Sequence, residues 1–313
     1  MPLTLDDLRD SPDHYLHSFD GDDAVFVPMD RAAYHRSIFL DGRISAASGG
    51  SKRIPISSLS GEMRPIGWIF HIAHCGSTLL ARALDEPHAN LVLREPAALR
   101  QVCVTPDARK LQLVLTMLGK RYSPEAPTLV KANVPVNFNL HQIIGRDPNA
   151  RAVFLHCQLR DYLLAVLRSD GHRQWVRQVT NQFAPALGSV AALSDAQRAA
   201  ALWFGQMRIF AEALRMMPNA RSLDSESFFN DPKPVLAAAA AQLEIEISAA
   251  RIDQIVSEPL FSTSAKNPAL AFNNAQRLAR RADLAAAIGT ELDEAERWVE
   301  NVGGGIQLER PIR

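Results

Sequence analysis

One stretch of the sequence has the composition of an anion-binding loop. An apolar run over residues 68–72 is followed by the polar turn HCGST at residues 74–78, and leucines then recur at helical spacing. Gly76 lets backbone N–H groups approach an anion, and the hydroxyls of Ser77 and Thr78 can donate hydrogen bonds to it. The stretch therefore predicts a phosphate-binding strand, turn and helix. A strand, turn and helix without a ligand is the alternative.

This turn differs from the usual nucleotide-binding loop, G-x-x-x-x-G-K-[ST], at two positions. His71 stands in place of the first glycine, and Ser77 stands in place of the lysine. Without that lysine, ATP or GTP chemistry loses the main positive charge on the terminal phosphates. A nucleotide-dependent small-molecule kinase is therefore disfavoured, although Asp161 could be argued as its metal-binding acid. His71 supports another alternative, a degenerate loop in a non-catalytic binding protein.

Three further residues that could do chemistry each follow a predicted strand. Glu95 comes after the strand over 90–93, Lys131 ends the strand over 128–131, and Arg160 follows the strand over 151–156. Ligands of open α/β sheets bind at the carboxyl ends of the strands. There a glutamate can act as general base, a lysine can neutralise transferring oxygens, and an arginine can bind a phosphate. A solvated glutamate, a surface lysine and a local salt bridge are the alternatives.

The elements that must position these residues alternate between strand and helix from residue 67 to 243. Ser194, with Gln197 at the capping-box position, begins a helix, and Pro232 follows the cap of another. This alternation predicts an α/β fold, a three-layer αβα arrangement with a mostly parallel central sheet. Residues 66–313 are assigned to this domain, and residues 1–65 to a small N-terminal extension that contains a β-hairpin.

Net charge, apolar stretches and cysteine content indicate which partners and which cellular compartment to expect. The 313 residues include 34 Lys plus Arg and 34 Asp plus Glu, so net charge gives no argument for nucleic acid or an anionic membrane as partner. The N-terminus lacks a signal peptide, and no stretch of about 18 apolar residues predicts a membrane span. The three widely spaced cysteines fit reduced thiols in a cytoplasmic protein.

Taken in order, these segments resemble the PAPS-dependent sulfotransferase superfamily, in particular its tyrosylprotein-sulfotransferase-like and bacterial branches. The run HCGSTLLARALDEPHANLVLREP resembles the loop that binds the phosphosulfate, together with the second strand. The run RDPNARAVFLHCQLRDYLLAVLRS resembles the strand and 3'-phosphate motif, with Tyr162 in place of proline and Ser169 one residue late. The resemblance covers roughly residues 66–268 and implies the P-loop version of the αβα fold.

The resemblance also implies a role for individual residues. Glu95 falls on the glutamate used as base and Lys131 on the lysine that steadies the sulfuryl oxygens, while His74 stands where the family has arginine or lysine. If His74 carries that charge, activity should fall as the pH rises through the pKa of the imidazole. The implied donor-binding residues are His74, Cys75, Gly76, Ser77, Thr78, Leu79, Arg160, Arg168, Ser169, Ser264 and Lys266.

The function implied is sulfuryl transfer from 3'-phosphoadenosine 5'-phosphosulfate (PAPS) to a hydroxyl or amine, without a metal. The acceptor is expected to be a small molecule or a peptide, and its identity cannot be derived from the sequence. Neither nucleic acid nor a membrane is expected as a partner, and a homodimer is allowed.

Overall fold

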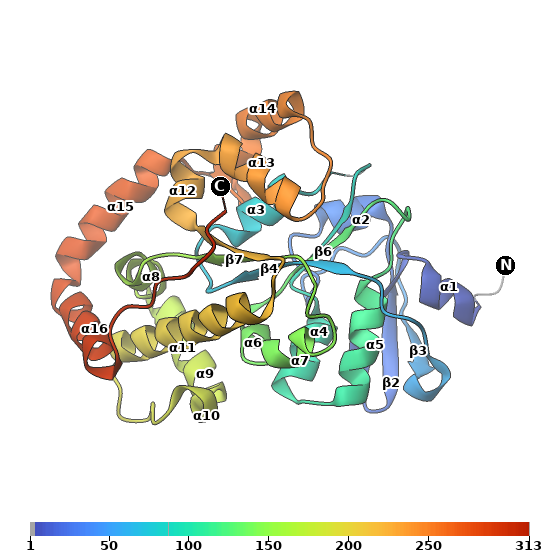
Figure 1. The fold of residues 1–313 in the computed structure, drawn as a ribbon, viewed down its shortest axis with the longest axis horizontal. Helices are drawn as coiled ribbons and strands as arrows, with labels where there is room; N and C mark the ends of the chain where they lie inside the picture. The colour runs from blue at the N-terminus through green and yellow to red at the C-terminus, as the bar shows by residue number, and fades with distance from the viewer. Residues whose placement is uncertain (1–3, 87, 313) are drawn as a thin grey trace.

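The computed structural model describes residues 4–86 and 88–312, so residues 1–3 of the predicted extension and Arg313 lie outside it. In the described chain a five-stranded parallel sheet has the order β5-β6-β4-β7-β8. Helices α3, α12 and α13 cover one face, and α6, α7 and α11 cover the other (Figure 1). The predicted three-layer αβα class with a parallel central sheet is confirmed. The strands of this sheet are β4 (Ile66–His71), β5 (Leu91–Arg94), β6 (Thr128–Lys131), β7 (Ala152–His156) and β8 (Ala220–Asp224).

The other elements of the α/β part follow the predicted alternation, with additional short helices. Before β8 they are α3 (Ser77–Ala83), α4 (Ala97–Val104), α5 (Ala108–Leu118), α6 (Val134–Asn137), α7 (Leu140–Ile144), α8 (Leu159–Val166), α9 (Asp170–Gln182), α10 (Ala184–Leu187) and α11 (Asp195–Met216). After β8 they are α12 (Ser225–Asn230), α13 (Pro232–Gln242), α14 (Ala249–Ser257), η2 (Pro259–Phe261), β9 (Thr263–Ser264), β10 (Asn267–Ala271), α15 (Asn274–Ala287) and α16 (Gly289–Val302).

The register of the central strands brings the predicted functional residues to one edge of the sheet. Arg94 of β5 lies opposite Lys131 of β6, and Lys131 in turn lies opposite Ile69 of β4. Because the strands are parallel, the residues that follow each strand emerge on the same side. Glu95, Lys131 and the loop after β4 therefore meet at the carboxyl edge.

Stacked aromatic rings fix the long helix α11 against the sheet. The rings of Trp68 and Phe70, two residues apart on β4, are stacked with centroids 5.3 Å apart, and Phe70 stacks on Phe154 of β7 at 5.2 Å. Phe154 also contacts Phe210 of α11, with centroids 4.8 Å apart. All of these rings are buried. Ring contacts of this kind add to the apolar burial and hold the sheet and helix in one arrangement.

The N-terminal part is a small antiparallel sheet packed on α4 and α5. Its elements are α1 (Leu5–Asp10), β1 (His14–Asp20), β2 (Asp23–Pro28), α2 (Arg31–Arg36), β3 (Lys52–Pro55) and η1 (Ile56–Ser58). The strand order is β1-β2-β3, and a tight turn with Gly21 at φ 56° joins the first two strands. The hairpin expected from the sequence is therefore extended by a third strand.

A buried arginine joins this part to the central sheet. The side chain of Arg94 is 1% exposed and donates to the Asp85 carboxylate and to the carbonyls of Tyr34, His35 and Ser37. These carbonyls belong to the end of α2, where helical hydrogen bonding runs out. A buried guanidinium is tolerated because its donors are satisfied in this way.

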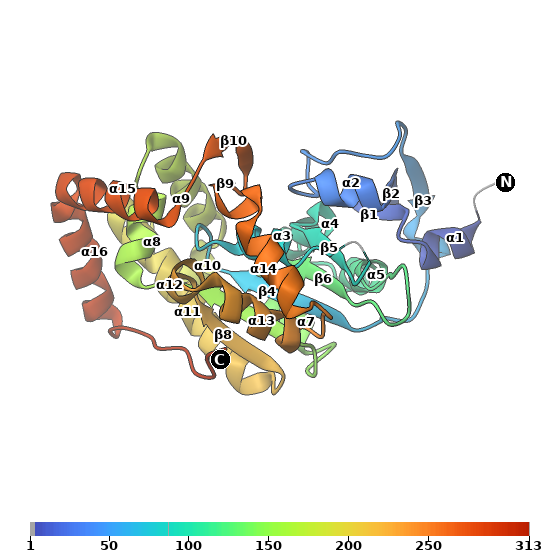
Figure 2. The same cartoon turned by 90° about the horizontal axis from the view of Figure 1, so that it is seen from above.

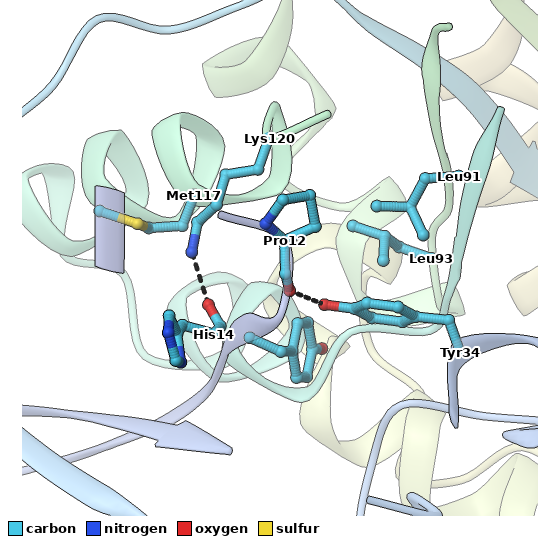
Figure 3. A pocket seen from close by; sticks show the side chains of 8 residues that line it. Pro12, His14, Tyr34, Leu91, Leu93, Met117 and Lys120 are labelled. Atoms are coloured by element: carbon cyan, nitrogen blue, oxygen red, sulfur yellow. Dashed lines mark hydrogen bonds between the residues drawn. The ribbon is translucent and has the colours of Figure 1, made fainter. Parts of the chain in front are cut away.

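A buried lysine makes a second connection of the same kind. Lys120 follows α5, and its Nζ donates to the carbonyls of Leu8, Ser11 and His14, at 2.7, 3.3 and 2.5 Å. Figure 3 shows the ammonium directed at the His14 carbonyl, beside Met117 and the hydrogen bond from Tyr34 to Pro12. Burial lowers the pKa of Lys120 to about 7.

We expect Lys120→Met to lower the free energy of unfolding by about 2–4 kcal/mol, because buried carbonyls lose their donor. The unfolded lysine keeps its usual pKa of 10.5, so the unfolded chain binds more protons above pH 7. The stability that depends on this group therefore rises with pH above about 7 and is lost as the pH falls back through it. Urea unfolding should show the gap between wild type and variant widening from about pH 7 to 8.5.

Lys110→Met is the matched control, because Lys110 lies on α5, which Lys120 follows, and donates to the Gly21 carbonyl from a more exposed position. It should cost less than about 1 kcal/mol at either pH. A gap for Lys120→Met that shrinks as the pH rises would contradict the burial argument.

Candidate active site at the carboxyl edge

The loop after β4 is sharply curved. Ala73, His74 and Gly76 have φ values of 75°, 52° and 83°. Left-handed residues in a tight loop can turn backbone N–H groups toward one concave side, which suits an anion. A Cβ at Gly76 would lie 2.9 Å from the ring of Phe229, so both the backbone and the packing require glycine there. The predicted strand, glycine turn and helix are therefore present.

The loop holds a buried hydroxyl without a partner. Ser77 and Thr78 are both buried, and Thr78 Oγ1 has no hydrogen-bond partner within the described chain. Leu79 beside them packs into the core. A buried polar atom without a partner costs about 1–3 kcal/mol, and a ligand that accepted a hydrogen bond from the Thr78 hydroxyl would recover this free energy.

His71 stands at the position of the first glycine of the usual loop, and its side chain is buried. Its Nδ1 accepts the Ala73 N–H at 3.1 Å, which places the proton of the neutral ring on Nε2. Nε2 lies 3.9 Å from Glu95 Oε1 and, among the residues described, has no hydrogen-bond partner. Burial and the charges of Lys131 and Lys266 lower the pKa of His71 well below its usual value. The ring is therefore a neutral support for Glu95.

Glu95 and Lys131, both predicted from the sequence, form an ion pair at the centre of the site. Lys131 is 1% exposed and Glu95 is 18% exposed at the side chain. The Glu95 amide donates to the Lys131 carbonyl at 2.8 Å, and Glu95 has a φ of 57°. A left-handed backbone at a non-glycine residue costs about 1–3 kcal/mol, and such strain clusters at functional sites.

The end of α8 and the start of α9 contribute a second polar group. Arg168 donates from Nη2 to His172 Nε2 at 2.7 Å, and Ser169 Oγ lies 2.6 Å from His172 Nδ1. The His172 ring packs against the His74 ring with centroids 5.0 Å apart. Arg168 and Ser169 are therefore brought next to the loop through His172, which sequence reasoning did not identify. Its position, four residues after Arg168, was the available signal.

The β9–β10 hairpin brings Ser264 and Lys266 to the same edge. Ser264 pairs with Asn267 across the hairpin, and Arg82 of α3 donates to the Ala265 carbonyl at 3.0 Å. Desolvation and the nearby charge of Lys131 lower the pKa of Lys266. Helix α3, which follows the loop, is therefore bonded to the hairpin tip and keeps that tip beside the loop.

Two predicted residues have other contacts. Arg160 pairs with Glu296 of α16 at 2.9 Å, so its guanidinium is engaged away from the loop. Cys75 is buried, its thiol donates to the Leu155 carbonyl at 3.6 Å, and burial raises its pKa to about 11. Cys75 is therefore a protonated thiol that packs beneath the loop.

The structure changes the expectation for His74. Burial and then the charges of Lys266 and Arg168 lower the pKa of His74 well below 6.5. His74 is therefore a neutral imidazole near pH 7, and the positive charge beside the loop comes from Lys131, Lys266 and Arg168. The predicted loss of activity as His74 deprotonates near neutral pH is not supported by this environment.

Asn133 is a further residue that the sequence did not single out. It follows β6 by two positions, it is buried, and its Oδ1 has no hydrogen-bond partner among residues 4–86 and 88–312. Unpaired polar atoms of His71, Thr78 and Asn133 thus belong to residues at or after the ends of two neighbouring strands, β4 and β6. Such a cluster is typical of a site that binds a polar ligand. Asparagine at a strand exit is common in turns, which left it without a distinct signal.

Two sulfotransferases are among the solved structures that are similar to this chain. One is a sulfotransferase domain from the curacin biosynthetic pathway, 12% identical, covering 79% of this chain and 100% of that one, with a TM-score of 0.43. The other is a sulfotransferase from Alicyclobacillus acidocaldarius, 12% identical, covering 77% and 96%, also at 0.43. No protein-family model and no curated protein matches the sequence. Both structures are named as sulfotransferases, which is also the superfamily that the sequence resembles. At 12% identity they do not show the activity of this chain, which depends on its own site residues.

Two further features are absent from the residues that the structure describes. None of their helices combines the length and the apolar character that a membrane crossing requires. They also contain no group of three or more His, Cys, Asp or Glu side chains arranged to hold a metal ion.

We expect His71 and His74 to remain neutral throughout the range from about pH 6 to 8. His35 should behave in the opposite way, because its hydrogen bond to Asp85 raises its pKa. Histidine NMR titration, assigned with His71→Gln, His74→Gln and His35→Gln, measures all three. A midpoint for His74 above that of His35 would contradict the burial of the loop.

Proposed function

We propose that this protein is a sulfotransferase that moves a sulfuryl group from PAPS to the hydroxyl or amine of a small molecule or peptide. One observation carries the proposal. The Glu95–Lys131 pair lies at the carboxyl edge beside a glycine loop that lacks the lysine of ATP-binding loops. A base and a cation next to an anion-binding loop are the groups that sulfuryl transfer requires.

The residues fit the phosphosulfate end of PAPS, which supplies a sulfuryl group activated by its anhydride link to phosphate. The curved backbone of residues 74–78 would face the 5'-phosphate, with the unpaired Thr78 hydroxyl as donor. Lys266 at the hairpin tip adds a positive charge at the same position. No requirement for a metal follows from this arrangement, because protein cations surround the loop.

Arg168 and Ser169 are better suited to the 3'-phosphate than Arg160. Arg168 is exposed, and among the described residues it donates only to His172, whereas Arg160 is paired with Glu296. Desolvation and then the charge of Arg168 lower the pKa of His172, which favours the neutral imidazole. An arginine bound to a neutral imidazole can transfer its donors to a phosphate at little electrostatic cost. The 3'-phosphate distinguishes PAPS from ATP, so this contact would set the nucleotide specificity.

Glu95 would accept the proton of the acceptor hydroxyl or amine as the nucleophile attacks sulfur. Lys131, within reach of Glu95, would donate to the sulfuryl oxygens while negative charge builds up on them. The bond between sulfur and the bridging oxygen breaks, the electron pair leaves with adenosine 3',5'-bisphosphate, and the new bond joins sulfur to the acceptor. The protein thus provides positioning and charge stabilisation, as in phosphoryl transfer.

A loop that binds a nucleotide without transferring a group is the second candidate function. It is favoured by His71, which takes up the Ala73 N–H and so removes one donor from the loop.

Calorimetry should show that adenosine 3',5'-bisphosphate binds more tightly than AMP, or than ATP with magnesium. Arg168→Gln should weaken its binding by about tenfold or more, the value of one charge-assisted contact. Arg160→Gln is the matched control and should change it little. Preferential binding of ATP, or equal effects of the two arginine variants, would contradict the proposed donor site.

Sulfate transfer from labelled PAPS, measured over a panel of hydroxyl and amine acceptors, tests the catalytic pair. Glu95→Gln and Lys131→Ala should each lower kcat by about 10²–10⁴-fold, the range for loss of a general base or a charge-stabilising group.

Glu244→Gln is the control for the base, because Glu244 has the same φ of 57° and pairs with Arg151 outside the site. It should keep the wild-type rate. Full activity of Glu95→Gln with every acceptor would exclude Glu95 as the base.

A further inference from the structure

The N-terminal segment 37–44 lies directly against the catalytic pair. Its Leu40 amide donates to the Arg94 carbonyl at 2.7 Å, and the Leu40 carbonyl accepts the Ala97 N–H at 3.1 Å. These bonds bracket Glu95 on both sides in the chain. The Tyr15 hydroxyl also donates to the Leu40 carbonyl, at 3.3 Å. The segment is therefore held in place beside Glu95 by backbone hydrogen bonds, which fix the side chains that it presents.

Phe39 and Arg43 are the side chains that this segment brings to the pair. The Phe39 ring is buried, and the Lys131 Nζ lies 5.5 Å from its centroid. The Arg43 guanidinium carbon lies 3.9 Å from the same centroid, and the Arg43 side chain is 59% exposed. Stacking on an aromatic ring fixes the plane of a guanidinium. Arg43 is therefore a preorganised cation at the mouth of the site.

One edge of the Arg43 guanidinium is used within the protein. Nε donates to Asp41 Oδ1 at 2.9 Å and Nη2 donates to Asp41 Oδ2 at 2.5 Å. Guanidinium has five N–H groups, so the Nη1–Nη2 edge keeps donors whose spacing matches a carboxylate or sulfate. No hydrogen bond from Nη1 is present among the described residues. Asp41 raises the pKa of Arg43, and the nearby charge of Glu95 adds to this effect.

Glu95 has charged neighbours from two distant parts of the chain. Lys266 of the hairpin is close enough to feel the charge of Glu95, and so is Arg43 of the segment whose Leu40 is hydrogen-bonded to Arg94 and Ala97. Figure 2 shows the β9–β10 hairpin and the N-terminal elements β1, β2 and α2 rising on the same side of the molecule, separated along its length. If the donor occupies the loop and hairpin, the acceptor reaches Glu95 from the side of segment 37–44.

We propose that Arg43 binds an oxyanion on the acceptor, so that the substrate is a hydroxyl compound with a second, negatively charged group such as a carboxylate. This rests on the proposed function, because it assigns the acceptor side of the same site. A positively charged second group would find little here, because both Asp41 oxygens are already used by Arg43. Arg43 is a specificity-determining residue, while Glu95 takes the proton.

The test compares matched acceptors that differ in charge at one group. Labelled sulfate transfer from PAPS to 4-hydroxyphenylacetate and 3-hydroxybutyrate is measured beside transfer to the corresponding amides. Wild type should favour the carboxylates by about tenfold or more in kcat/KM, the value of one charge-assisted fork. Arg43→Gln should remove this preference by raising the KM of the carboxylates. It should leave the amides and the binding of adenosine 3',5'-bisphosphate unchanged.

Arg53→Gln is the matched control, because Arg53 is also 59% exposed and pairs with Asp20 in the N-terminal sheet. It should keep the preference for the carboxylates. A preference that survives Arg43→Gln, or intact bisphosphate binding without transfer to either carboxylate, would overturn the role of Arg43. Failure of wild type to bind the bisphosphate would instead show that the proposed function is wrong.

Discussion

The site depends on the burial of the Lys131 ammonium beside the Glu95 carboxylate. An ammonium removed from water loses several kcal/mol of solvation unless a partner compensates for it. Glu95 supplies that partner, and its backbone there has a left-handed conformation. Substrate groups that approach this pair meet a charge already stripped of water, which strengthens each interaction they make.

Two buried cations lie side by side at the ends of β5 and β6, and they have different roles. The donors of Arg94 are directed to backbone carbonyls of the N-terminal part and to Asp85, so this side chain is saturated by the protein. Lys131 faces a carboxylate and the ring of Phe39, and neither uses all of its donors. Arg94 therefore stabilises the fold and Lys131 remains available for chemistry, although the two residues are in register on neighbouring strands.

The sequence was informative where local patterns decide the outcome. Apolar runs of strand length and their alternation with helices predicted the parallel sheet, and the strand exits predicted that Glu95 and Lys131 would lie at its carboxyl edge. The N-terminal part was assigned only as an extension, because no periodic pattern shows that Arg43 and Phe39 face a residue more than fifty positions away. The environments of His74 and Arg160 could not be predicted either. The burial of His74 and the pairing of Arg160 with Glu296 depend on residues that come much later in the chain.

The buried connections of the N-terminal part also constrain the order in which the chain can fold. The carbonyls of residues 8–14 and 34–37 depend on Lys120 and Arg94 as donors, and ribosomal synthesis delivers both much later than the acceptors themselves. Until then the first strands lack both the helices on which they pack and the donors that these carbonyls need. In a nascent chain, roughly the first sixty residues should therefore remain incompletely folded until α5 has emerged. Segment 37–44, beside Glu95, would then reach its folded position together with the central sheet.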